Sequence, residues 1–420
     1  MTEVAVDELL QRAQTCMDQH QVMEARELYS RICKLDDTKA EAWLMLGALN
    51  ADIGILDEGM SCIERALTLQ PANAEAHLTL AHILRSQNKY QEALKAGQKA
   101  VDLDPQYAEG WLLLSGIYGH LDQFDDVEAC SRRTIKLWED CADAHVNLAG
   151  ALHRQKRWVE AEASYRRALA LGSDLAEVHA NLGNVLLAQD RFQEAEAALQ
   201  QAIRQAPTSD SAYINLGAAY LRQGRTEEAI LALRQAVEYA PHRAEAHLRL
   251  GMALEDLDRF EAALASYQEA VRQAPDNVNI RYRIGHALEN QGKLDEASAA
   301  YQQVLDSQPD DPNATAGLAS IAEKRGDPDT AYILLRPTLG TGTANLKAAL
   351  TLSRICSRYV NCPEVISLLE SLVLDQDLSY RERANAHFTL SWLYENAGDA
   401  DAAARHIKQG NALKRGPARG

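Results

Sequence analysis

The chain has 420 residues, of which 46% are hydrophobic, 25% are charged and only 6% are aromatic, and its formal net charge is −17. This composition excludes a disordered protein, and the acidic balance argues against nonspecific nucleic-acid binding by the chain as a whole. No run approaches the roughly 18 apolar residues that a membrane span needs, the N-terminus lacks the pattern of a secretory leader, and the seven cysteines form no CxxC pair, so we expect a cytoplasmic protein with reduced thiols.

Prolines recur at a fixed interval along the chain. Six of them are separated by thirty-four positions or by multiples of that interval, namely Pro71, Pro105, Pro207, Pro241, Pro275 and Pro309. If the first unit begins at Val6, later units begin at residues 40, 74, 108, 142, 176, 210, 244, 278 and 312. A fixed period of this size predicts an array of small helical units, each of which buries its apolar face against its neighbours.

Within each unit, the pattern predicts two antiparallel helices joined by a short polar turn. The eighth and twentieth positions of a unit are small, as in Gly183 and Ala195, so the two helices can approach closely. Large apolar or tyrosine side chains at the seventh and twenty-fourth positions supply the contact between the helices. Gly54, Gly224 and Gly292, and at the same place Asn88, Asp190 and Asp258, predict the end of the first helix.

The pattern weakens toward the C-terminus. Ten units in phase extend over residues 6–345, although the last one, which carries Pro337, is partly degenerate. Residues 346–378 predict a divergent helix pair, and residues 384–415 predict a final unit whose polar last helix caps the array. We expect residues 416–420 to be a disordered tail.

The segment AYINLGAAYLRQGRTEEAILALRQAVEYAP (212–241) resembles the tetratricopeptide-repeat family, and the resemblance covers residues 6 to about 335. The repeats are most similar to those of the O-GlcNAc transferase family and of bacterial repeat proteins with a C-terminal sulfotransferase domain, a domain that this sequence does not contain. The resemblance implies an all-α fold, a right-handed α-solenoid of helix-turn-helix units. It also implies a concave groove that binds other proteins.

Asparagine occupies the sixth position of three consecutive units, as Asn147, Asn181 and Asn215. A side-chain amide both donates and accepts hydrogen bonds, so it can pair with the backbone of a peptide of any sequence. Similar asparagines line the groove in the O-GlcNAc transferase family, which implies a peptide-binding role for these three and for Asn184 on the same face. The alternative is that polar residues at this position simply solvate an exposed helix face.

Four arginines extend the predicted groove beyond the asparagines. Arg249 and Arg283 replace asparagine at the sixth position, and Arg154 and Arg222 occupy the thirteenth. Guanidinium groups bind carboxylates well, so these arginines could select an acidic peptide or a terminal carboxylate. The alternative is that they are ordinary solvated surface residues.

No residues in the sequence suggest a catalytic, metal or cofactor site. Five histidines at the fourth position of their units belong to different repeats, so neighbouring ones should lie too far apart to share a zinc ion, and we expect them to pack between helices. They are His77, His145, His179, His247 and His387. No nucleophile, paired carboxylates or phosphate-binding loop stands out from the repeat pattern.

Two functions follow from these observations. The first is a non-enzymatic scaffold or adaptor whose groove binds an extended peptide or a helix of a partner protein, without nucleic acid. The second is the substrate-recognition arm of a sulfotransferase or glycosyltransferase system whose catalytic domain is missing or separately encoded. The sequence does not define the oligomeric state.

Overall fold

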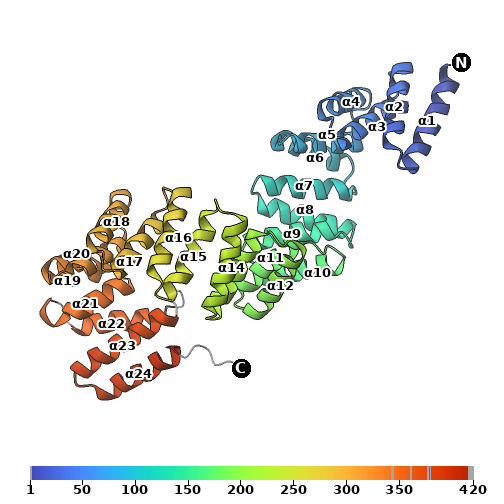
Figure 1. Ribbon diagram of the computed structural model, residues 1–420. Helices are drawn as coiled ribbons and strands as arrows, with labels where there is room; N and C mark the ends of the chain where they lie inside the picture. Colours follow the sequence, from blue (N-terminus) through green and yellow to red (C-terminus); the bar gives the residue numbers. More distant parts are fainter. Residues whose placement is uncertain (1, 342–344, 360–361, 376–377, 379, 415–420) are drawn as a thin grey trace. The chain divides into compact units, whose positions relative to one another are not determined.

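The structure is a computed structural model that describes residues 2–341, 345–359, 362–375, 378 and 380–414. These residues form 24 α-helices and contain no strand (Figure 1). The helices of the first six repeats are α1 (Thr2–Asp18), α2 (Val22–Leu35), α3 (Ala40–Asp52), α4 (Leu56–Leu69), α5 (Ala74–Ser86), α6 (Tyr90–Leu103), α7 (Ala108–His120), α8 (Phe124–Leu137), α9 (Ala142–Arg154), α10 (Trp158–Ala170), α11 (Ala176–Ala188) and α12 (Phe192–Gln205). The others are α13 (Asp210–Arg222), α14 (Thr226–Tyr239), α15 (Ala244–Asp256), α16 (Phe260–Gln273), α17 (Val278–Asn290), α18 (Leu294–Ser307), α19 (Pro312–Lys324), α20 (Pro328–Thr341), α21 (Leu346–Tyr359), α22 (Cys362–Leu372), α23 (Tyr380–Asn396) and α24 (Ala400–Lys414).

The turn inside each repeat has one residue in the left-handed region of backbone conformation. This residue stands at the fifteenth position in all ten repeats, where φ lies between 56° and 84°, and it is glycine in four of them. The amide of the residue that follows it donates to a carbonyl five residues earlier, as Lys89 does to Leu84 at 2.9 Å. This is the hydrogen bond that ends a helix in a Schellman motif, and it confirms the predicted break between the two helices. The left-handed residues are His20, Gly54, Asn88, Asp122, Lys156, Asp190, Gly224, Asp258, Gly292 and Gly326.

Glycine at the eighth position allows the two helices of a repeat to touch. A Cβ atom added to Gly217 would lie 2.7 Å from Leu233 Cγ, and one added to Gly285 would lie 2.8 Å from Tyr301 Cε1. Leu233 and Tyr301 occupy the twenty-fourth position and are fully buried. The predicted close packing of these two positions is therefore confirmed, and the large side chain occupies the space that a methyl group would need.

The helices form two layers. Within each unit, most successive odd-numbered helices approach each other directly, as α7 does with α9 and α17 with α19, whereas no two even-numbered helices of the described residues approach comparably. The odd-numbered helices therefore form an inner layer on the side of tighter curvature, and the even-numbered helices form an outer layer.

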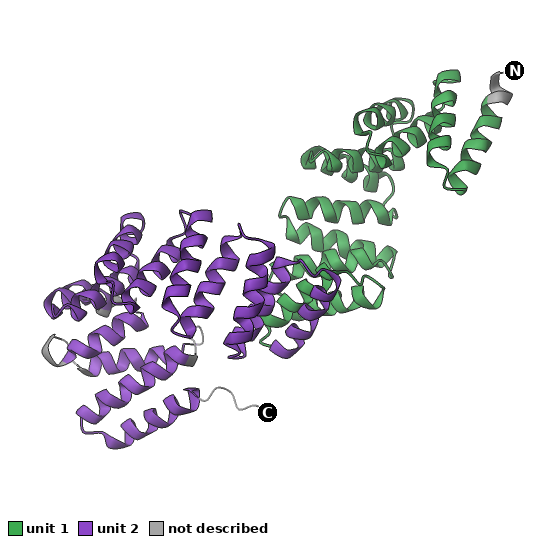
Figure 2. Ribbon diagram, viewed as in Figure 1, with its two compact units in different colours: residues 1–191 green, residues 192–420 purple. Residues whose placement is uncertain are grey.

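The chain divides into two compact units, residues 1–191 (unit 1) and 192–420 (unit 2) (Figure 2). The boundary falls between the two helices of the repeat that begins at residue 176. Each unit is a stack of antiparallel helix pairs whose core consists of small and branched apolar side chains. No helix within the described ranges combines the length and the apolar character needed to cross a membrane.

A repeated ion pair connects consecutive repeats. The arginine at the sixteenth position donates to the glutamate at the twenty-first position of the repeat before it: Arg157 to Glu128 at 2.6 Å, Arg191 to Glu162 at 2.5 Å and Arg225 to Glu196 at 2.7 Å. The three carboxylates are only 11–17% exposed. The next repeat therefore supplies a counter-charge to each of these mostly buried carboxylates.

The last two helix pairs lie in the segments where the sequence pattern weakens. Helices α21 and α22 lie in the divergent segment, and α23 begins at Tyr380, four residues before the predicted start of the final unit. Pro337 lies inside α20. The predicted tail at 416–420 lies outside the described residues.

Candidate functional site

Several rings at the fourth position of the repeats bond to the preceding turn. His77 Nε2 lies 3.0 Å from the carbonyl oxygen of Pro71, and His247 Nε2 lies 2.8 Å from that of Pro241. Trp111 occupies the same position and donates its indole N–H to the carbonyl of Pro105 at 3.2 Å. These rings satisfy carbonyl groups of the turns between repeats. No group of three potential metal ligands is found among the residues that the structure describes.

Asn147 lies on the inner layer and is already partly engaged. Its side-chain N–H group donates to Ser115 Oγ on α7, at 2.8 Å, and Ser115 in turn donates to the carbonyl of Leu112. The amide of Asn147 therefore joins two successive inner helices, α7 and α9. Its oxygen and its second N–H have no protein partner in the described chain, so they are available for a ligand.

Asn181, Asn184 and Asn215 differ from Asn147 because no hydrogen bond within the described chain engages their side chains. The residue that corresponds to Ser115 is Ala149 before Asn181 and Gly183 before Asn215, and neither has a side-chain oxygen. All three asparagines are partly buried. Asn181 and Asn184 lie on α11 in unit 1, and Asn215 lies on α13 in unit 2.

Arg154 and Arg222, at the thirteenth position, cover aromatic rings of the preceding repeat. The guanidinium carbon of Arg154 lies 5.0 Å from the centre of the Phe124 ring, and that of Arg222 lies 5.2 Å from the centre of the Phe192 ring. These are cation–π distances, and they give both arginines a packing role at the edge between repeats. Both side chains are nevertheless exposed, so a ligand can reach them.

Arg249 and Arg283 both have carboxylate partners in the chain. Arg249 donates to Glu245, one helical turn earlier, at 3.0 Å. Arg283 lies 3.7 Å from Glu255, which also accepts a hydrogen bond from the hydroxyl of Tyr267 at 2.5 Å and is paired with His286. A peptide carboxylate would therefore have to compete with these partners. Burial opposes ionisation of Glu255, but His286 and Arg283 outweigh it and hold the pKa of Glu255 below its ordinary value.

Glu289 is the centre of a second buried cluster, which the repeat pattern does not predict. Its carboxylate, whose side chain is 3% exposed, accepts from Tyr301 at 2.8 Å, Ser320 at 2.6 Å and Lys324 at 2.9 Å, and it pairs with Lys347 of α21. Burial alone would raise the pKa of Glu289, but Lys347 above all lowers it to about 2. The cluster joins α17, α18, α19 and α21 through one charge.

The N-terminus of α23 also contacts a distant part of unit 2. Arg381 donates to both carboxylate oxygens of Asp258, at 2.7 and 2.9 Å, and to the carbonyl of Asp256 at 2.9 Å. Asp256 and Asp258 lie at the end of α15 and in the turn after it. Helix α23 therefore contacts α15, and α21 contacts α17. These two inner helices carry Arg249 and Arg283.

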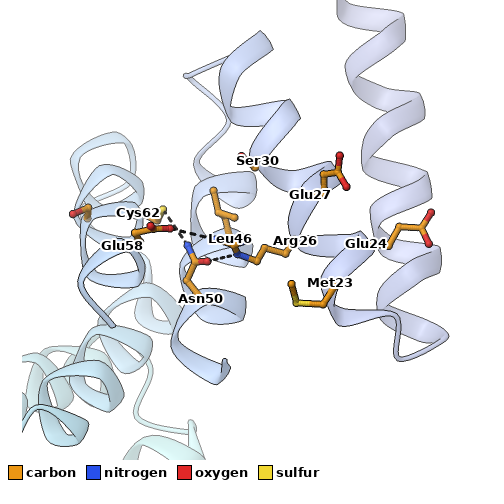
Figure 3. Close-up of a pocket in the computed structure, with 10 residues that line it drawn as sticks. Met23, Glu24, Arg26, Glu27, Ser30, Leu46, Asn50, Glu58 and Cys62 are labelled. Carbon is orange, nitrogen blue, oxygen red and sulfur yellow. Dashed lines mark hydrogen bonds and ion pairs between the residues drawn. The ribbon is translucent and has the colours of Figure 1, made fainter. Parts of the chain in front are cut away.

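A cleft lies on the outer layer of unit 1, between α2 and α4, with α3 at its base (Figure 3). Its volume is about 680 Å³. Arg26 extends across it, donating to Asn50 at 2.6 Å and to Glu58 at 3.3 Å. The Sγ atom of Cys62 lies 3.9 Å from the side-chain nitrogen of Asn50. Burial raises the pKa of the Cys62 thiol, so it is protonated at neutral pH and is a poor nucleophile.

Sequence comparison with protein families identifies tetratricopeptide repeats over much of the chain. Family models described as tetratricopeptide repeat match residues 40–73, 74–107, 140–208, 180–238, 215–278 and 256–321. The first two matches begin and end at the predicted unit boundaries. The comparison with curated proteins gives no match.

Three solved structures are similar to this chain at low sequence identity. The YrrB protein, described as a TPR protein with an unusual peptide-binding site, shares 20% identity over 44% of this chain and 96% of its own, with a TM-score of 0.39. PilF of Pseudomonas aeruginosa shares 20% identity over 49% of this chain and 94% of its own, with a TM-score of 0.45. A chain of the APC/C hetero-tetramer Cut9–Hcn1 shares 13% identity over 98% of this chain and 94% of its own, with a TM-score of 0.47. Together with the fixed repeat period and the paired helices, the family matches show that this chain belongs to the tetratricopeptide-repeat family, an all-α repeat solenoid.

Proposed function

We propose that the chain is a non-enzymatic scaffold that holds an extended peptide or a helix of a partner protein against its inner helices. Tetratricopeptide repeats serve in general as protein-interaction scaffolds, which supports the broad assignment. The finer proposal is that side-chain amides of the inner layer pair with the partner's backbone. We expect the protein to act in the cytoplasm.

One observation carries this proposal: Asn181 and Asn184 are partly buried on α11, and nothing in the described chain bonds to their amides. Several other polar side chains of the inner layer have a partner within the chain, as the contacts of Asn147, Arg249 and Arg283 show. A partly buried amide without a partner is costly, because burial removes some of its bonds to water. A bound peptide backbone would supply the missing donors and acceptors.

The spacing along the inner layer suits an extended chain. Neighbouring packed helices lie roughly 8–10 Å apart, and three residues of an extended strand span about 10 Å. Asn147 and Asn181 lie on α9 and α11, successive inner helices of unit 1, so they can hold peptide groups three residues apart. Asn215 has the same place in the first complete repeat of unit 2, and we assign it the same role.

Affinity capture with the wild-type chain and with a triple variant, Asn147→Ala, Asn181→Ala and Asn215→Ala, tests the proposal. We expect partner proteins to be retained by the wild type and largely lost from the variant, and crosslinks to fall on α9 and α11. Asn411→Ala, on the exposed surface of α24, is the control and should retain them. If the triple variant captures the same partners equally well, the amides do not hold them.

A further inference from the structure

We propose that a second surface, the outer cleft between α8 and α10, docks an acidic peptide that carries an apolar side chain. The cleft is a wedge between two even-numbered helices, with α9 at its base, and its volume is about 430 Å³. The cleft does not include the inner-layer asparagines, so this proposal can be tested independently of the function proposed above. We call it the α8–α10 cleft.

The charge of the α8–α10 cleft is opposite to that of the chain. Arg132, Lys136 and Arg167 line it, and none of the described side chains that line it is acidic. The chain as a whole carries a net charge of −17. The α2–α4 cleft also lies between two neighbouring even-numbered helices, but it presents Glu24 and Glu27 in its lining. The positive lining is thus a property of these particular residues and not of the repeat.

Two of the three cations are paired within the chain, and all three side chains remain exposed. Arg132 is paired with Glu128 at 2.9 Å and with Glu160 at 3.3 Å, and Arg167 is paired with Asp140 at 3.0 Å, yet both arginine side chains stay about half exposed. Lys136 is exposed and has no ion pair within the described chain. Its ammonium group is therefore the cation most available to an incoming carboxylate.

The base of the cleft is apolar, and this feature favours a peptide over a simple anion. Leu148 of α9 forms part of the base, and Ile135 and Ala163 line the two walls. Burial lowers the pKa of His145, so its ring adds no charge to the base at neutral pH. Inorganic phosphate could satisfy the cations but would leave the apolar base uncovered. A leucine or similar side chain flanked by carboxylates matches both parts of the cleft.

The test uses a short fluorescein-labelled peptide of glutamates around a central leucine, titrated with the full chain and followed by fluorescence anisotropy. Lys136→Glu should weaken binding about tenfold, because it replaces an attraction by a repulsion. Ala163→Trp should weaken it as well, because the indole fills the cleft while all three cations remain. The control, Lys99→Glu, makes the same charge change at an exposed site on α6 and should leave binding unchanged.

Four results would overturn the proposal. These are equal binding by Lys136→Glu, an equal loss with Lys99→Glu, equal binding of a peptide in which lysine replaces glutamate, and complete displacement by inorganic phosphate at physiological concentration. Circular dichroism of each variant confirms that the helices are intact. The triple asparagine variant should bind the peptide as the wild type does, which separates this surface from the inner layer.

Discussion

Neutralising Glu289 should cost much of the stability of the C-terminal part of unit 2. The substitution Glu289→Gln keeps the shape of the side chain but removes the charge that holds Lys347 and Lys324. A carboxyl group whose pKa falls from 4.5 to about 2 on folding contributes about 3 kcal/mol to the free energy of unfolding at neutral pH. We therefore expect the variant to be about 3 kcal/mol less stable at pH 7.

The loss should depend on pH in a defined direction. Because folding lowers the pKa of Glu289, its contribution is complete above the pKa of the unfolded chain and disappears as the pH falls through about 2. The difference between wild type and variant should thus be largest at pH 7, drop below half by about pH 3, and vanish only below about pH 2.

Urea unfolding followed by circular dichroism between pH 7 and pH 3 measures this difference. Hydrogen exchange at pH 7 then shows whether the loss is local to α17, α19 and α21. Glu296→Gln, at an exposed position of α18, is the control and should change the stability by less than about 0.5 kcal/mol. A difference that stays constant with pH, or one below about 1 kcal/mol at pH 7, would refute the reasoning.

Two further substitutions test the packing and the long-range contact of unit 2. Gly217→Ala places a methyl group against Leu233 and should destabilise the chain by about 2 kcal/mol in urea unfolding. The control is Gly150→Ala, whose added methyl group would have its nearest neighbour 3.9 Å away and which should be neutral or stabilising. Equal effects of the two substitutions would contradict the packing argument. Arg381→Ala removes the contact of α23 with Asp258 and should cost about 1 kcal/mol, seen as roughly fivefold faster hydrogen exchange at the start of α23. Unchanged exchange there would show that this contact does not hold the helix.

The regular features of the fold could be predicted from the sequence because they recur in every unit. Gly224 marks a turn and Gly217 marks a close helix contact, and each role depends only on neighbours within one repeat. The fixed period made such roles visible by repetition. Local steric requirements of this kind leave the same trace in each copy.

The candidate site was less predictable because it depends on side chains from other repeats. The partner of Asn147 is Ser115, and whether an asparagine is free depends on that one residue of the previous unit. Arg283 was predicted to line the groove, but its contact with Glu255 was not predicted. The sequence does contain a signal for it, because glutamate occupies the twelfth position only in the last three complete repeats. Lys347 could not be assigned a partner at all, since it lies in the segment that departs from the repeat pattern.

The ties made by Lys347 and Arg381 change how the array should unfold. A tandem repeat protein is commonly treated as a line of units, each coupled only to the next, so that its ends fray one unit at a time. Lys347 bonds to a residue 58 positions earlier, and Arg381 bonds to one 123 positions earlier. These links skip over intervening repeats, so α15 to α23 should unfold together as one cooperative block. The described N-terminal repeats should still unfold one repeat at a time.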